Sequence, residues 1–287
     1  MPALPSINLQ NVKFDSGSAP SLFFILKLCY NKNMKKVNLI VLAGGKGIRL
    51  NVKARPKVLF EVKGKPMIGR ILKTMSKIAE INKIIFVVGF RGQMVIDYIK
   101  SEKRKIKSAK AVEFAWQRRQ LGTGHATLKA ISYVKNSPFP TIVLNGDHPY
   151  FGGKTIKNLL NKFYQAMAEN RPKIIITETQ IDKNSNFGRI IKDRDSNVIK
   201  VVEVKNATAT EFKIRQGNVG TYLFDTRWLG ENLSKIKKDK ISGEYYLTDL
   251  VGIAVAQGEK VPAAPVARRI DAIGINTFDD LQQAQNT

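Results

Sequence analysis

The sequence VNLIVLAGGKGIRL, residues 37–50, joins an apolar run to a turn that contains three glycines. The first seven residues carry no charge. A short run of branched apolar side chains bounded by glycines predicts a strand that is buried on both faces. Such a strand belongs inside a sheet that helices cover. This stretch therefore indicates an α/β fold.

Strands and helices alternate from this stretch to about residue 180. Further strands are predicted at 84–88, 111–116, 141–144 and 173–178. Helices are predicted at 67–81, 93–99, 125–134 and 154–168. The alternation implies right-handed crossovers and a mostly parallel, Rossmann-like sheet with helices on both faces. Ligands bind at the carboxyl ends of the strands in such a sheet, so informative residues should directly follow strands.

The pattern changes after residue 187. Segments 188–192 and 198–204, joined through Asp195-Ser196-Asn197, predict a β-hairpin. A strand at 219–224 and helices at 227–233, at 245–256 and from residue 279 are predicted to follow. The chain therefore combines a parallel α/β part with a smaller part that contains the hairpin.

The chain is strongly basic, with 48 Lys and Arg residues against 23 acidic ones and a formal charge of +25. The basic residues are scattered, and the densest run, at 100–110, contains no aromatic side chain for base stacking. We therefore favour a solvated surface over nucleic-acid binding. A basic surface would also attract anionic substrates.

One cysteine and two histidines occur in the chain, which argues against a disulfide framework, a zinc cluster and a histidine-rich metal site. The apolar run at 22–30 is too short to span a membrane, and residues 1–33 lack the features of a signal peptide. We therefore expect a cytoplasmic protein. Residues 1–33 are expected to be a disordered extension, or to precede a true start at Met34.

The glycine-rich turn at 44–47 suits a phosphate. Its glycines let the backbone approach an anion closely, and exposed amides form a nest for it. Arg49 and Lys57 add positive charge nearby. The turn is not a Walker A loop, because no Lys-Ser/Thr pair follows it at the required spacing, and it lacks the third glycine of a dinucleotide fingerprint. A purely structural tight turn is the alternative.

Two other segments place polar side chains after strands. QRRQLGTGHA, residues 117–126, offers an amide at Gln117 that can pair with a uracil edge. The alternative is a helix start with Thr123 as its N-cap. Asn145-Gly146-Asp147 offers a carboxylate suited to Mg²⁺. The alternative there is a loop aspartate that caps the next segment.

With Pro56-Lys57 downstream, the turn at 42–50 resembles the signature of the sugar-1-phosphate nucleotidylyltransferase superfamily, although Ile48 stands where the family usually has Thr. The stretch QLGTGHA, residues 120–126, is similar to the uridylyltransferase branch that acts on N-acetylglucosamine-1-phosphate. Further matches occur in family order at Phe187-Gly188-Arg189, Glu203, Asn218, 243–249 and Gly274-Ile275-Asn276. The resemblance covers 34–287 and implies the nucleotide-diphospho-sugar transferase fold. It also implies a nucleotide half of about 34–180 and a sugar-binding half of about 181–287.

The resemblance implies roles for individual residues. Arg49 and Lys57 are the implied catalytic cations, and Asp147 and Asn276 are the implied Mg²⁺ ligands. The implied sugar contacts are Gly188, Glu203 and Asn218. The implied nucleotide contacts are Leu42, Ala43, Gly44, Gly45, Gln117, Gln120, Gly122 and Thr123.

The implied activity is Mg²⁺-dependent transfer of a uridylyl group from UTP to N-acetylglucosamine-1-phosphate, so these two substrates are the expected partners. The same chemistry on glucose-1-phosphate, or on mannose-1-phosphate with GTP, stays an alternative because Asn-Gly-Asp also occurs in such relatives. A catalytically silent paralogue is a further alternative. The chain lacks the hexapeptide repeats of the bifunctional members' acetyltransferase β-helix, so only the uridylyl step is expected. No oligomeric state is indicated.

Overall fold

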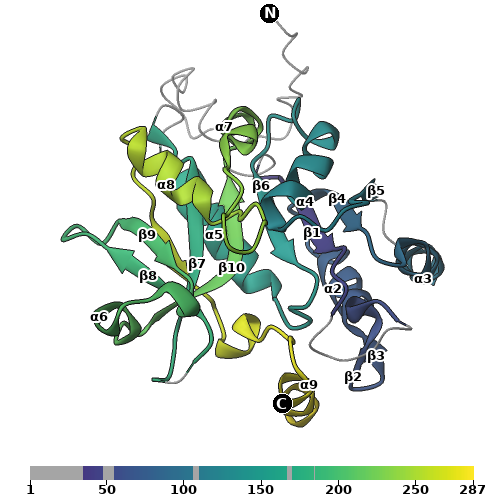
Figure 1. Cartoon of the computed structure of the whole chain (residues 1–287). Helices are drawn as coiled ribbons and strands as arrows, with labels where there is room; N and C mark the ends of the chain where they lie inside the picture. Colours follow the sequence, from purple (N-terminus) through teal and green to yellow (C-terminus); the bar gives the residue numbers. More distant parts are fainter. Residues whose placement is uncertain (1–34, 48–54, 106–109, 167–169, 184) are drawn as a thin grey trace, which may run out of the picture. The chain divides into compact units, whose positions relative to one another are not determined.

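A twisted sheet forms the centre of residues 36–287, which make up one compact unit in the computed structural model (Figure 1). The structure describes residues 35–47, 55–105, 110–166, 170–183 and 185–287. Nine strands of the described residues form the sheet, and seven of them lie in the order β11-β7-β10-β6-β1-β4-β5. These seven are β11 (Ala263–Pro265), β7 (Ile174–Gln180), β10 (Gln216–Phe224), β6 (Thr141–Asn145), β1 (Val37–Ala43), β4 (Ile81–Val88) and β5 (Ala111–Trp116).

The predicted α/β class with a mostly parallel sheet is confirmed. β1 pairs in parallel with both β4 and β6, β4 pairs in parallel with β5, and β11 pairs in parallel with β7. Only β10, among these strands, runs antiparallel to its neighbours β6 and β7. A hairpin of β8 (Gly188–Lys192) and β9 (Val198–Val202) branches from β10, as the sequence predicted for this segment.

Helices cover both faces of the sheet, because alternate residues of its strands point to opposite sides. Leu39 and Val41 of β1 pack with one buried cluster, and Ile40 between them packs with the other. The first cluster includes side chains of α2 (Met67–Met75), α3 (Gly92–Lys105) and α5 (Gly153–Gln165). The second includes side chains of α4 (Thr123–Ala130), α7 (Thr226–Asn232) and α8 (Asp249–Ala256).

Small elements complete the fold, and the chain's last segment packs against one of them. β2 (Glu61–Val62) and β3 (Lys65–Pro66) form a short ribbon, α6 (Ala209–Phe212) is a single turn, and α9 (Phe278–Asn286) ends the fold. Val62 and Met67 bury a third cluster with Ile275 and Ala284. This packing fixes the segment just before α9, where Asn276 lies.

The helices predicted at 67–81 and 245–256 are both shorter in the structure. The helix predicted at 67–81 ends at Met75, and Ile78 to Ile81 form a turn that leads into β4. The helix predicted at 245–256 begins only at Asp249. Its expected first turn is not helical, because Tyr245 N donates to Leu121 O and Gly124 N donates to Tyr245 O. Hydrogen bonds to a distant segment thus replace those that a helix would provide.

The apolar run at 22–30 and the rest of the expected extension, residues 1–33, lie outside the part of the chain that the structure describes, which begins at residue 35. Within that described part, no helix combines the length and the apolar character that crossing a membrane requires.

Candidate active site

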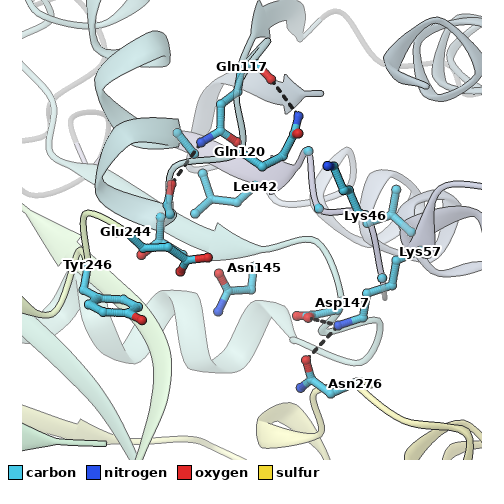
Figure 2. A pocket seen from close by; sticks show the side chains of 17 residues that line it. Leu42, Lys46, Lys57, Gln117, Gln120, Asn145, Asp147, Glu244, Tyr246 and Asn276 are labelled. Carbon is cyan, nitrogen blue, oxygen red and sulfur yellow. Dashed lines mark hydrogen bonds and ion pairs between the residues drawn. The ribbon is translucent and has the colours of Figure 1, made fainter. Parts of the chain in front are cut away.

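A cavity of about 480 Å³ lies at the carboxyl ends of β1, β5 and β6 (Figure 2). Because these strands are parallel, the residues that follow them meet at one edge of the sheet. Ten of the residues predicted from the sequence line the cavity: Leu42, Gly44, Gly45, Lys57, Gln117, Gln120, Gly122, Thr123, Asp147 and Asn276. Of the other predicted nucleotide contacts, Ala43 is buried in β1 and is not part of the lining. Arg49 lies outside the described residues.

Three residues from distant parts of the chain form a charged centre at one end of the cavity. Lys57 Nζ donates to Asp147 Oδ2 at 2.6 Å and to Asn276 Oδ1 at 2.9 Å (Figure 2). We call Lys57, Asp147 and Asn276 the charged centre. Their convergence in one place agrees with the sequence prediction that they share a site.

The backbone around the charged centre explains why its members meet. Gly146 N donates to Leu42 O, which holds the segment after β6 against the end of β1. Ile275 N donates to Asp147 O, and Asp280 Oδ2 accepts from Asn276 N, so Asn276 is held beside Asp147. The helix that follows, α5, has Gly152 as its N-cap, so Asp147 does not cap it, which was the alternative to a ligand role.

The Asp147 carboxylate is ionised in this setting. Burial alone would raise its pKa, but the Lys57 ammonium and the hydrogen bond with His148 outweigh burial and hold the pKa of Asp147 well below its usual range. His148 Nδ1 lies 2.9 Å from Asp147 Oδ1. The carboxylate is thus a permanent negative charge at neutral pH.

The oxygen atoms of the charged centre suit a hard cation. Asp147 Oδ2 and Asn276 Oδ1 both accept from Lys57 Nζ, so a carboxylate oxygen and an amide oxygen lie close together, and Mg²⁺ prefers such oxygens in combination with substrate phosphates and water. In the described residues no cluster of three or more His, Cys, Asp or Glu side chains could hold a metal by itself. The donor set therefore fits a Mg²⁺ site that substrate phosphates complete.

The glycine-rich turn lies beside the charged centre. Gly44, Gly45, Lys46 and Gly47 line the cavity. Gly47 has a φ of +65°, and a Cβ at this position would come within 2.8 Å of Lys57 Cβ. The absence of a side chain thus lets the turn pass directly over Lys57, so that backbone amides and an ammonium can face the same anion.

A loop after β5 forms the opposite end of the cavity. Gln117 Nε2 donates to Gly122 O at 3.0 Å, and Gln120 Nε2 donates to Gln117 O at 3.1 Å (Figure 2). Gly122 is the N-cap of α4 with a φ of +93°, so Thr123 is not the N-cap. The Thr123 hydroxyl instead accepts from Leu247 N, because the 244–247 segment lies alongside this loop.

Sequence reasoning missed several residues of the lining. Lys46, Asn145, Glu244 and Tyr246 all line the cavity, but none was assigned a role (Figure 2). Tyr246 fell within the helix predicted at 245–256, and Glu244 directly precedes that helix. The match of 243–249 to the family was the signal that could have placed them in the site.

The predicted sugar contacts lie outside this lining. Gly188 and Asn218 are register partners of β8 and β10, and Glu203 follows β9 directly. Asn218 Nδ2 donates to Tyr222 Oη at 2.7 Å, and burial raises the pKa of Glu203. We call Gly188, Glu203 and Asn218 the sugar branch. Its link to the cavity is Asn145, whose Nδ2 donates to Gly220 O in β10 at 3.4 Å.

Known proteins with this sequence pattern are nucleotidyl transferases. The family model described as Nucleotidyl transferase matches residues 38–268. The bifunctional protein GlmU of Exiguobacterium sibiricum is 35% identical over 248 residues, which are 86% of this chain and 52% of that protein. GlmU of Geobacillus thermodenitrificans is 36% identical over 252 residues, 88% and 52% of the two chains. The chain thus spans about half the length of these curated relatives.

Solved structures share the fold. UDP-glucose pyrophosphorylase complexed with UDP-glucose superposes with a TM-score of 0.67 at 20% identity, and the match covers 88% of this chain and 97% of the other. 4-Diphosphocytidyl-2C-methyl-D-erythritol synthase of Anaerococcus prevotii superposes with a TM-score of 0.58 at 18% identity and the same coverage. These likenesses confirm the predicted fold class.

Proposed function

This chain belongs to the nucleotidyl transferase family, and from that premise we propose that it transfers a uridylyl group from UTP to N-acetylglucosamine-1-phosphate. The products are UDP-N-acetylglucosamine and pyrophosphate. The observation that carries the proposal is the charged centre, which shares one cavity with the glycine-rich turn and Gln117. Cation, carboxylate, anion nest and amide are the groups that a nucleoside triphosphate and its attacking phosphate require.

The reaction needs no protein nucleophile. A phosphate oxygen of the sugar phosphate forms a bond to the α-phosphorus of UTP, and the bond from that phosphorus to the pyrophosphate oxygen breaks. The sugar phosphate is largely a dianion near neutral pH, so no general base has to remove a proton. Catalysis then rests on positioning and on neutralising the charge that builds up on the phosphates.

The chain's own residues supply most of this stabilisation. In the proposed complex the amides of 44–47 bind the triphosphate, and the Lys57 ammonium neutralises charge at the α-phosphate and the leaving pyrophosphate. Arg49 remains a predicted second cation. Asp147 and Asn276 would hold Mg²⁺, which as a Lewis acid withdraws charge from phosphate oxygens. The Gln117 amide and the Gly122 backbone would bind the uracil.

The sugar branch is the proposed acceptor site. The Gly188 amide would meet the acetamido carbonyl, Glu203 would accept from sugar hydroxyls, and Asn218 would complete the pocket. The similarity of 120–126 to the N-acetylglucosamine-1-phosphate branch supports this acceptor. Glucose-1-phosphate is the second candidate, because Asn145 is shared with glucose-specific relatives and its side chain lines the cavity.

A substrate panel tests the proposal. Each of the four ribonucleoside triphosphates is combined with the 1-phosphates of N-acetylglucosamine, glucose and mannose in the presence of Mg²⁺, and pyrophosphate release is followed. We expect UTP with N-acetylglucosamine-1-phosphate to give the highest kcat/KM. The panel is repeated with Asp147→Asn to show that turnover belongs to this site. Turnover of no pair would refute the proposed activity, and a better rate with another sugar or base would replace the substrate.

A further inference from the structure

The orientation of the Gln117 amide is determined by its neighbours. Its nitrogen lies 3.0 Å from Gly122 O, and a carbonyl oxygen can only accept. The same nitrogen lies 3.0 Å from His125 Nδ1. Because an amide nitrogen only donates, Nδ1 has to accept. His125 is therefore a neutral imidazole that carries its proton on Nε2.

This arrangement uses both amide hydrogens of Gln117 on one side. Its Oε1 lies on the other side, where a Cβ added to Gly44 would come within 3.1 Å of it. Figure 2 shows the amide nitrogen turned toward the loop carbonyl and the oxygen turned away from it, on the side of Gln120. Gln117 thus offers an acceptor, rather than a donor, to a base in the cavity.

The surroundings of His125 favour its neutral form. Burial lowers the pKa of His125, and the positive charges of Lys129 and Arg119 lower it further. Lys129 lies on the same helix, Arg119 lies in the loop that precedes it, and the ring of Tyr245 from the 244–247 segment lies 6.5 Å away. No acidic side chain is among the groups that shift this pKa.

We propose that His125 is a positioning residue for base selection. As the Nε2–H tautomer it holds the Gln117 amide with its oxygen toward the base, and so favours uracil over cytosine. Uracil presents N3–H, which can donate to this oxygen, whereas cytosine presents a lone pair at the same ring position. With cytosine, two hydrogen-bond acceptors would face each other in a desolvated site, and the cost of leaving both unpaired favours UTP over CTP strongly. The proposal rests on the proposed uridylyl function, because it assigns the choice of UTP.

Two substitutions separate the acceptor role of His125 from its bulk. His125→Phe retains a ring but removes Nδ1, so the ratio of kcat/KM for UTP to that for CTP should fall at least about tenfold. His125→Asn places an amide oxygen close to the position of Nδ1 and should retain most of the ratio. Lys129→Gln, one turn further along α4, is the matched control and should leave the ratio within about twofold of the parent. Equal ratios for parent and His125→Phe, with both folded by circular dichroism, would overturn the proposal.

The pH dependence gives a second test. Protonation would turn Nδ1 into a donor facing another donor, so the UTP-to-CTP ratio should decrease as pH falls through the lowered pKa of His125. The ionisation of the phosphates cancels in this ratio, and the protonation of cytosine N3 at low pH affects the parent and His125→Phe equally. His125→Phe should abolish the part of the dependence that His125 causes, and the same pH dependence of the ratio in His125→Phe as in the parent would contradict the mechanism.

Nitrogen NMR tests the tautomer without any turnover. The chain has only two histidines, so the ring nitrogens of His125 can be assigned by comparison with His125→Phe. We expect the Nε2–H tautomer at pH 7, and an Nδ1–H or charged ring would overturn the proposal. Calorimetric binding of UTP and CTP then tests base selection alone. Failure of every sugar phosphate in the substrate panel would refute the activity, whereas equal binding of UTP and CTP would refute only the role of His125.

Discussion

The charged centre and the sugar branch are built in different ways. The charged centre joins Lys57 to Asp147 and Asn276, which lie 90 and 219 positions further along the chain. Its contacts are ionic or charge-assisted hydrogen bonds inside the cavity. The sugar branch lies within residues 188–218, with Gly188 on β8, Asn218 on β10 and Glu203 directly after β9, and Asn218 bonds to Tyr222 within its own strand. The chemistry is therefore fixed by long-range contacts, whereas the branch can vary locally without disturbing them.

The largest effect is expected at the metal end of the charged centre. Asp147→Asn keeps the size and an acceptor for Lys57 but removes the negative charge, so turnover should fall about 10³-fold at saturating Mg²⁺. Asp182→Asn is the matched control, because Asp182 pairs with Arg269 on the surface, with side-chain exposures of 87% and 73%. Steady-state kinetics measure both variants. Similar turnover in Asp147→Asn and the parent would remove Asp147 from the mechanism.

A somewhat smaller loss is expected for the cation. Lys57→Ala should lower kcat about 10²–10³-fold, the usual scale for removing one preorganised electrostatic group. Lys157→Ala removes an exposed lysine that lies 3.7 Å from Glu80 and should leave kcat within about twofold. A loss below tenfold for Lys57→Ala would mean that the glycine-rich turn and Lys57 have a structural role only.

The sugar branch should show intermediate effects that spare the nucleotide. Glu203→Gln should lower kcat/KM about tenfold with both N-acetylglucosamine-1-phosphate and glucose-1-phosphate, because the two sugars share the hydroxyls involved. The KM for UTP should stay unchanged. Burial raises the pKa of Glu203, so its ionised form is disfavoured in the folded state, and the neutral amide should leave the Tm equal or higher at pH 7. A large rise in the UTP KM would show that the two regions are not separable.

The smallest effect concerns the choice between two sugar phosphates as substrate. The parent should prefer N-acetylglucosamine-1-phosphate to glucose-1-phosphate at least about tenfold in kcat/KM, which corresponds to about 1.4 kcal/mol. A pocket that leaves polar groups unpaired with the wrong sugar gives such a preference, whereas a merely roomy pocket does not. Equal or better use of glucose-1-phosphate would identify Asn145 as the more informative residue.

Much of the fold followed from local pattern. The apolar runs of β1, β4 and β6 are buried on both faces and could be recognised without any partner. The direction of β10 could not be predicted, because an apolar strand has the same pattern in either orientation. Residues 245–247 were wrongly predicted as helical, since their pairing with 121–124 depends on residues more than a hundred positions away.

Some residues of the site could likewise be predicted from the sequence, and others could not. Lys57, Asp147 and Asn276 were predicted because each lies in a short motif, and the structure brings them together. Lys46 lies within the glycine-rich turn and Glu244 within the matched segment 243–249, but neither side chain was assigned a role of its own. The role inferred for His125 required the positions of Gly122 O and Gln117 Nε2, which no spacing in the sequence reveals.

The members of the charged centre lie far apart in the sequence, so they can meet only in a certain order while the chain is being synthesised. Ribosomes release a protein from its N-terminus, so β1, β4, β5 and β6 can pair while later residues are still being added. Lys57 and Asp147 can then meet, but the bond from Lys57 to Asn276 spans 219 residues and closes a very long loop. The centre is therefore completed only when the last segment docks through Ile275. A nascent chain that has already formed most of its sheet still lacks a complete centre, so activity in a timed translation experiment should trail the appearance of protease-resistant sheet.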